Sequence, residues 1–470
     1  MQEYKQPLSS VKKAIIVSGV IIFFVFIIVT PPPGLSVQGA RALAVFVLCI
    51  TLWVTAWIPL GITSLLGIAL IPLLGVMSAR EAFSFFGDRA VFFILGALML
   101  AAAIYQTGLG ARIALLFLVR FGRKPNHIIL GIMLAAALLS CIMPEHAVAA
   151  MLFPIVFEIA RSLDLKQGFS NMGKAMFLAM AWGAIIGGVT TYLGGARNIL
   201  AVGLLEKSYG LSIGFFEWIK YAFPLPLIIL GISYLLIIKY FRPEIEDAEK
   251  AYRILLDRVQ AMGKASFSEK KLMVIMIGVI SAWLFLSGQV NIAVTALLGG
   301  VAIFLFKIIS WEELSGYVNW GVILMYGGAI VVATALTKSG ATEWIANIVI
   351  YSIPLNGFLF LILISFLTKT VTEGISNVAA VAIVLPIAFS TGGVFGINPI
   401  VTSLLVALSG GLAFCLPMGT PPNAIAYSAG FYKISDVLKA GILLNIISII
   451  VIIFVALFYW PLVGLELFVR

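Results

Sequence analysis

Charged residues are scarce in this sequence, and their scarcity excludes an ordinary soluble protein. Of 470 residues, 11% are charged and 62% are hydrophobic, whereas a soluble globular chain carries about 25% charged residues. Apolar runs of roughly 20 residues, the length needed to cross a bilayer, recur along the whole chain. We therefore expect a multi-pass protein that is integral to the plasma or inner membrane of a cell and is surrounded by the lipid bilayer.

Cysteine and histidine are also scarce, which excludes several kinds of site. The three cysteines and two histidines have no spacing typical of a disulfide framework or a metal site. The sequence contains no His-Glu-x-x-His, no Gly-x-Ser-x-Gly and no paired intramembrane aspartates, so we expect neither an enzyme nor a cofactor. The net charge of +10 comes without a basic stripe interleaved with aromatic residues. It favours basic cytoplasmic loops over a nucleic-acid partner.

The ends and the middle of the chain suggest its organisation. Lys5, Lys12 and Lys13 precede an apolar run, and three prolines follow that run where a signal peptide would have small residues. We expect an uncleaved first span over 1–33 with a cytoplasmic N-terminus. The longest charged stretch, 242–271, is expected to be a solvated linker between a first repeat, 34–241, and a second repeat, 272–470.

The two halves of the chain repeat one another. A shift of 232 residues carries Thr63 to Thr295, Gly96 to Gly328 and Pro154 to Pro386. A shift of 225 residues carries Asn198 to Asn423 in a second matched segment. Repeated halves with interrupted apolar segments are typical of secondary transporters, whose binding site lies near the membrane midplane. We expect helical hairpins over 126–160 and 357–390, and broken helices over 173–205 and 400–430.

Polar residues interrupt the apolar segments of the second half. Ser376 and Asn377 precede an apolar helix, where they can cap its first turn or leave its partly positive end to face an anion. In Thr420-Pro421-Pro422-Asn423 the prolines break a helix, and Asn423 can cap the restarted one. Lys369 and Glu373 lie four residues apart and are expected to pair.

The matching segments of the first half carry ionisable groups. Pro144-Glu145-His146 stands where the second half has Ser376-Asn377-Val378, and Gly195-Ala196-Arg197-Asn198 stands where it has Thr420 to Asn423. Buried charges within a membrane are costly and mark functional residues. Glu145 and Arg197 are expected either to form a structural ion pair or to take part in binding. A histidine at position 146 can also gain and lose a proton near neutral pH.

These segments resemble the divalent anion:sodium symporter (DASS) family. The resemblance lies in Thr372-Glu373 with Ser376-Asn377 and Pro386, in the 419–423 loop, in the segment 52–59 and in Phe216-Glu217-Trp218-Ile219-Lys220, and it covers the chain from about residue 34 onward. It implies an all-α fold of about eleven transmembrane helices, two re-entrant hairpins and two broken helices in inverted repeats. It also implies a homodimer that moves di- or tricarboxylates or sulfate with sodium by an elevator motion.

The resemblance also implies site residues. Thr372, Asn377 and the backbone of Gly419 would form one sodium site, and Ser140, Glu145 and Gly194 stand at the other. At that second position Glu145 replaces the motif's asparagine, so an internal charge or a proton can replace sodium. The substrate would meet residues from both hairpins and both broken helices: Glu145, His146, Arg197, Asn198, Ser376, Asn377, Val378, Thr420, Pro422 and Asn423.

The sequence therefore favours a secondary active transporter of small divalent anions. Dicarboxylates are the first expected substrates, followed by citrate and sulfate, with sodium as the coupling ion. Two other transporters remain open: a proton-coupled or exchange carrier of the same fold, and a cation:proton antiporter or inorganic-oxyanion carrier.

Overall fold

The described part of the chain is helical, as an apolar chain in a membrane must be. The computed structural model describes residues 10–55, 57–286, 289–352 and 356–469. Their regular secondary structure consists of helices, with one isolated β-bridge between Ile397 and Phe468. Helices form because bilayer lipid offers no hydrogen bonds, so each backbone N–H and C=O needs a partner within the chain. The expected all-α polytopic fold is confirmed. The N-terminal residues 1–9, whose cytoplasmic location was predicted, lie outside the described residues.

Several helices are long and apolar enough to cross a bilayer. Among the described residues six segments meet this condition alone, and α11 (Phe215–Ala222) with α12 (Pro224–Tyr240), bent by 43°, makes a seventh. The six are Val37–Thr55, Ala79–Gln106, Trp320–Lys338, Gly357–Gly374, Asn377–Val394 and Ile434–Leu462. Shorter apolar helices, such as α3 (Leu60–Leu73) and α15 (Ile292–Leu305), accompany them.

The helices of the two halves correspond in order, with α11 and α12 of the first half together standing where the second half has α23 (Ile434–Phe454). The first half contains α2 (Val37–Thr55), α3, α4 (Ala79–Ser84), α5 (Arg89–Gln106), α6 (Leu109–Leu118), α7 (Pro125–Ser140), α8 (Glu145–Ser162), α9 (Asn171–Gly187), α10 (Ala196–Tyr209), α11 and α12. The second contains α14 (Phe267–Phe285), α15, α16 (Trp311–Tyr317), α17 (Trp320–Lys338), α18 (Ala341–Ser352), α19 (Gly357–Gly374), α20 (Asn377–Val394), α21 (Pro399–Gly410), α22 (Pro421–Ser428) and α23 (Ile434–Phe454). Both ends of α3 and α8 fall 232 residues before those of α15 and α20.

The two halves are interlocked. Helix α3 packs on α17, and α15 packs on α5, so each half receives a helix of the other. At the crossings, a Cβ added to Gly96 would lie 2.6 Å from the backbone of Ala296, and one added to Gly328 would lie 2.4 Å from Ser64 Cβ. Gly96 and Gly328 are equivalent in the repeat, as are Ser64 and Ala296, so the two contacts mirror each other. The halves are therefore related by a pseudo-two-fold axis, and small residues let their helices approach closely.

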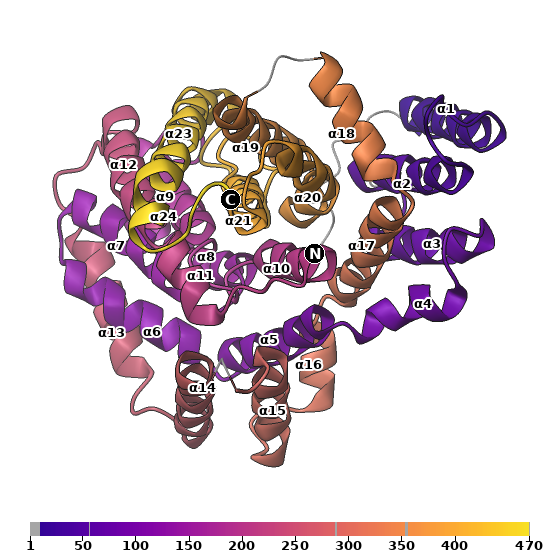
Figure 1. Ribbon diagram of the computed structural model, residues 1–470. Helices are drawn as coiled ribbons and strands as arrows, with labels where there is room; N and C mark the ends of the chain where they lie inside the picture. Colours follow the sequence, from indigo (N-terminus) through magenta and orange to yellow (C-terminus); the bar gives the residue numbers. More distant parts are fainter. Residues whose placement is uncertain (1–9, 56, 287–288, 353–355, 470) are drawn as a thin grey trace.

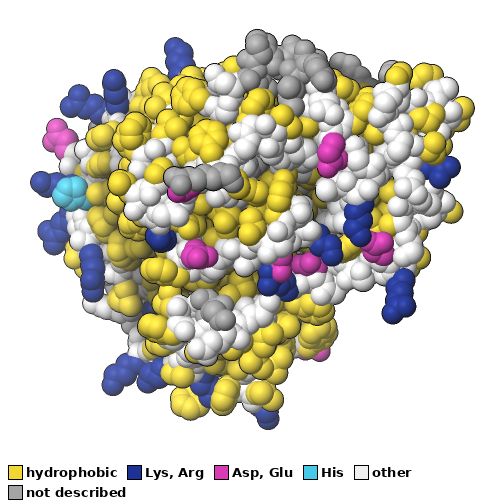
Figure 2. Space-filling view, in the orientation of Figure 1, with side chains coloured by type: hydrophobic (Ala, Val, Ile, Leu, Met, Phe, Trp, Pro, Cys, Tyr) yellow, Lys and Arg dark blue, Asp and Glu magenta, His cyan; other side chains and the backbone are white. Residues whose placement is uncertain are grey.

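The helices form a central group and a surrounding arc. Figure 1 shows the hairpins α7–α8 and α19–α20 with α9, α10 and α21 in the central and left part of the molecule, while α1 (Ser10–Val29) to α5 and α14 to α18 curve around its right and lower sides. Helix α22 packs on α8 and α9 and so belongs to the central group. Helices α10 and α20 contact the arc through α5 and α17. Hydrophobic side chains lie in every part of the face in Figure 2, between scattered charged ones.

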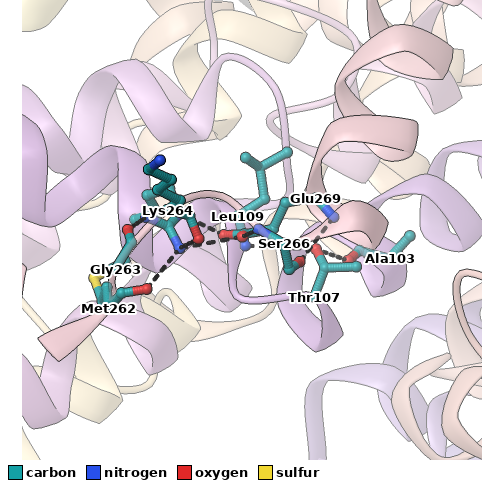
Figure 3. A network of polar contacts seen from close by, with 9 residues as sticks. Ala103, Thr107, Leu109, Met262, Gly263, Lys264, Ser266 and Glu269 are labelled. Carbon is teal, nitrogen blue, oxygen red and sulfur yellow. Dashed lines mark hydrogen bonds and ion pairs between the residues drawn. The ribbon is translucent and has the colours of Figure 1, made fainter.

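A polar network attaches the charged linker to the first half. The linker contains α13 (Glu249–Ala261), and Arg112 of α6 donates to the carbonyls of Met262, at 3.2 Å, and Gly263, at 2.8 Å, just after that helix ends. Arg112 Nε also donates to Glu269 Oε1 at 2.6 Å. Figure 3 shows these carbonyls beside Ser266 and Glu269, whose mutual hydrogen bonds cap α14. The division of the chain at residues 33, 241 and 271 stays a prediction.

Candidate functional site

The tips of the two hairpins meet inside the protein. Helix α8 begins at Glu145 and α20 begins at Asn377, which is the equivalent residue of the repeat. The Asn377 amide lies 3.3 Å from Glu145 Oε1, with Nδ2 as the donor. Both side chains are buried, each 5% exposed. A contact between equivalent residues places the pseudo-two-fold axis between them, where the binding site of a repeat transporter is expected.

Glu145 also forms a buried ion pair with Arg197. The guanidinium donates from Nη1 to Oε1 and from Nη2 to Oε2, both at 3.0 Å, which is the paired geometry that binds a carboxylate most strongly. Arg197 lies in the first turn of α10 and is 2% exposed. Glycine makes room for the pair, because a Cβ on Gly188 would lie 2.3 Å from Glu145 Oε2. The ion pair considered from the sequence is therefore formed.

The asparagines of the two broken helices hold their own loops. Asn198 Nδ2 donates to the carbonyls of Gly188 at 2.9 Å and Thr191 at 2.8 Å. Asn423 Nδ2 donates to the equivalent carbonyls, of Ala413 at 3.0 Å and Leu416 at 3.4 Å. Both amide nitrogens are therefore used to shape the loops between α9 and α10 and between α21 and α22. Only the amide oxygens could face a ligand.

Three oxygens and the amide of Asn377 come together beside the second hairpin tip. The Asn377 amide atom on this side lies 2.7 Å from Thr372 Oγ1, 3.2 Å from the Gly410 carbonyl oxygen and 3.1 Å from the Gly419 carbonyl oxygen. With the amide oxygen there, four oxygens face one another, which is the donor set that a small hard cation prefers. With the amide rotated, nitrogen donates to both carbonyls, and the oxygen accepts from Arg197 Nη1 at 3.2 Å. The second orientation gives both amide atoms hydrogen-bond partners, and the residue set fits a cation when the amide adopts the first.

The other predicted residues lie around this centre. Ser376 Oγ accepts from Ala379 N–H and caps α20, and Thr420 Oγ1 accepts from Asn423 N–H and caps α22. His146 is exposed, Val378 is half-buried and Pro422 is buried. Among the described residues, Ser140 Oγ is buried without a hydrogen-bond partner.

Helix N-termini supply positive charge at the same place. Helices α8, α10 and α20 begin at or beside the contacting residues Glu145, Arg197 and Asn377, and α22 begins just after the Gly419 carbonyl. Each helix N-terminus carries a partial positive charge of about one half, although the first two residues of α22 are prolines and supply no N–H group. Their convergence favours an anion near the hairpin tips without a large number of basic side chains.

Glu373 and Asn445 support the loop between α21 and α22, and the sequence reasoning missed Asn445. The Glu373 carboxylate accepts from three successive backbone N–H groups, Phe414 at 2.8 Å, Cys415 at 3.1 Å and Leu416 at 3.0 Å. Asn445 Nδ2 of α23 donates to the same carboxylate at 2.6 Å, and Asn445 Oδ1 accepts from Lys369 Nζ at 3.0 Å. Asn445 thus bridges Lys369 and Glu373, in place of the direct pair predicted from their spacing. A lone asparagine in an apolar helix was the only available signal.

Comparison with known proteins places these features in a wider group. Residues 11–465 match the profile described as the sodium:sulfate symporter transmembrane region. The chain is 27% identical to the sodium-dependent dicarboxylate transporter SdcS of Staphylococcus aureus (strain USA300), over 98% of this chain and 93% of that protein.

Two solved structures share the fold. The YdaH transporter of Alcanivorax borkumensis aligns with a TM-score of 0.55 at 15% identity, covering 85% of this chain and 89% of that one. MtrF of Neisseria gonorrhoeae aligns with a TM-score of 0.55 at 13% identity, covering 94% of both chains.

Proposed function

Because the chain belongs to the sodium:sulfate symporter transmembrane family, we propose that it is a secondary active transporter that carries small divalent anions together with sodium. Dicarboxylates are the proposed first substrates, and citrate and sulfate follow. The observation that carries the proposal is the junction of the hairpin tips, where helix N-termini lie beside three convergent oxygens and the Asn377 amide. An anion and a sodium ion bound there would stabilise each other.

The sodium site of this proposal is the oxygen cluster of the second half. Thr372 Oγ1, Asn377 Oδ1 and the carbonyls of Gly410 and Gly419 are the ligands, and Gly410 is an addition to the residues expected from the sequence. Sodium prefers such uncharged and hard oxygen donors. The substrate would lie beyond it against the N-termini of α20 and α22, near Ser376, Val378 and Pro422.

An elevator motion suits the two groups of helices. The hairpins and broken helices pack on one another, as in the contacts of α8 with α9 and of α20 with α21. They would move together past α5 and α17 and carry the site across the membrane. We also propose a homodimer in the cell membrane, with the arc of helices fixed and the central group moving.

An exchange carrier is the second candidate function. It is favoured by the buried Glu145–Arg197 pair, which gives the first half an internal counter-charge. In this candidate the loaded site crosses freely while the empty one does not, so transport in one direction requires an anion on the other side.

Uptake by purified protein in liposomes tests these proposals. Labelled succinate, citrate and sulfate would each be offered under a sodium gradient, a proton gradient, and with unlabelled anion inside. Sodium-driven uptake is expected, while uptake that requires internal anion and ignores sodium would favour exchange. No anion flux under any of the three conditions would refute both.

A matched pair of variants tests the sodium site. Thr372→Val removes a hydroxyl from the oxygen cluster and should weaken sodium dependence strongly. Thr368→Val is the control, because Thr368 lies one turn earlier on α19 and its hydroxyl donates only to its own helix, at Ile364 O. Equal sodium affinity in the two variants would refute the site.

A further inference from the structure

The two halves present opposite chemistry at equivalent positions. Thr372, Asn377 and Gly419 of the second half correspond to Ser140, Glu145 and Gly194 of the first. In the second half, the uncharged Thr372 hydroxyl, the Asn377 amide and the carbonyls of Gly410 and Gly419 face one another. In the first half, a carboxylate faces a guanidinium, with both Glu145 oxygens accepting from Arg197 at 3.0 Å. The position that suits a sodium ion in the second half is therefore occupied in the first half by the Arg197 guanidinium, a cation that is part of the chain.

The surroundings fix the Arg197 guanidinium in this place. A Cβ on Gly195 would lie 2.6 Å from its Nη1, and a Cβ on Gly411 would lie 2.4 Å from its Nε, so glycines of both broken-helix loops enclose it. An arginine side chain keeps its charge at all pH values relevant to proteins. Both Glu145 oxygens are used by the two parallel hydrogen bonds. A sodium ion on the same carboxylate would lie beside the fixed guanidinium charge, which would repel it.

We infer that Arg197 is a resident cation that takes the place of a coupling sodium in the first half, so that the protein binds one sodium ion per transport cycle, in the second half. The inference rests on the proposed function and adds the number of sodium ions that cross in each transport cycle. Glu145 and Arg197 together carry no net charge, so a dianion crossing with one sodium ion moves one net negative charge. An inside-negative membrane potential then opposes uptake. Exchange of one dianion for another moves no net charge, so the potential does not oppose it.

Sodium binding can be counted without transport. Calorimetric titration of the purified protein with sodium chloride, in a potassium chloride background, should give one site per chain. Two sites per chain in the wild-type protein would overturn the inference. Because this measurement needs no substrate, its outcome is separate from the uptake experiment that tests the proposed function.

Flux measurements give the same number independently. The ratio of labelled sodium to labelled succinate entering liposomes should be one, and an inside-negative potassium diffusion potential should slow the uptake. A ratio of two or more, or uptake accelerated by that potential, would contradict the inference.

A double variant tests whether the pair itself excludes sodium. Glu145→Asn combined with Arg197→Ala restores the uncharged amide of the second half and removes the tethered charge, and it should bind a second sodium ion. Arg197→Lys is the matched control, since it keeps the positive charge and should bind one. A double variant that keeps the wild-type elution profile and melting behaviour but still binds one sodium ion would count against the inference.

Discussion

The carboxylate of Glu145 and the amide of Asn377 are 232 residues apart in sequence and lie 3.3 Å apart in space. They occupy the same position in the two halves, so the chain contacts its own equivalent residue at the centre of the molecule. The first half has a glutamate where the second half has an asparagine, so the two halves differ at the pseudo-two-fold axis itself.

Removing one member of the Glu145–Arg197 pair should destabilise the protein. Glu145→Gln or Arg197→Met leaves a buried charge without its partner, which costs about 3–5 kcal/mol in typical proteins. The melting temperature of the detergent-solubilised protein should fall clearly for each single variant. The double variant, Glu145→Gln with Arg197→Met, should lose less stability than the sum of the two single losses, because no uncompensated charge remains. Single variants as stable as the wild type would show that the pair contributes little.

Asn377→Ala should abolish sodium-dependent transport, because it removes the amide from the oxygen cluster. Ser376→Ala is a comparison for sodium affinity alone, since Ser376 caps α20 on the proposed substrate side and lies outside the oxygen cluster, and loss of such a cap costs about 0.5–2 kcal/mol. We expect Ser376→Ala to melt somewhat earlier but to keep its sodium affinity. Sodium-driven uptake in liposomes measures both variants, and normal uptake by Asn377→Ala would mean that the hairpin site is misassigned.

Glu373→Gln should loosen the second broken-helix loop. The charged carboxylate accepts from three successive N–H groups and from Asn445, and charge-assisted hydrogen bonds are about twice as strong as neutral ones. The variant should melt earlier and bind sodium more weakly, since the loop also carries the Gly419 carbonyl. Glu343→Gln, at an exposed position on α18, is the control and should leave both melting and sodium affinity unchanged. Equal sodium affinity in the two variants would limit Glu373 to a role in stability.

Arg89 of α5 and Glu206 of α10 form an ion pair between the arc and the central group. Their side chains are 40% and 30% exposed, so the pair is worth only about 0.2–1 kcal/mol, which under the proposed elevator motion would shift the balance between the two orientations without fixing it. Arg89→Glu should therefore change the transport rate while sodium affinity stays the same.

The charge-swapped double variant, Arg89→Glu with Glu206→Arg, should restore the wild-type rate. Initial uptake rates at low and high ionic strength measure this effect, which salt should weaken. If the swap fails to restore the rate, the pair does not act as an electrostatic contact between the two groups.

The sequence was enough to predict the membrane class and the repeat, and it offered the Glu145–Arg197 ion pair as one of two alternatives. These conclusions depend on composition, on fixed shifts between halves, and on the cost of lone charges in apolar segments. The Gly410 carbonyl could not be foreseen, because a backbone oxygen has no side-chain signature. Neither could the use of the Asn198 and Asn423 amide nitrogens within their own loops, since propensity does not fix side-chain rotation. Asn445 lies 72 residues from the carboxylate that it contacts, and no local pattern reports such a contact.

The exchange of helices between halves has a consequence for synthesis of the chain. Helix α3 leaves the ribosome long before α17, and α5 long before α15, so the glycine and serine surfaces at Gly96 and Ser64 wait for partners made much later. The first half therefore has no finished core of its own while the second is being made. Contacts so distant in sequence form late and slowly. A chain cut within the charged linker should expose these surfaces and be degraded, whereas the two pieces produced together should protect each other.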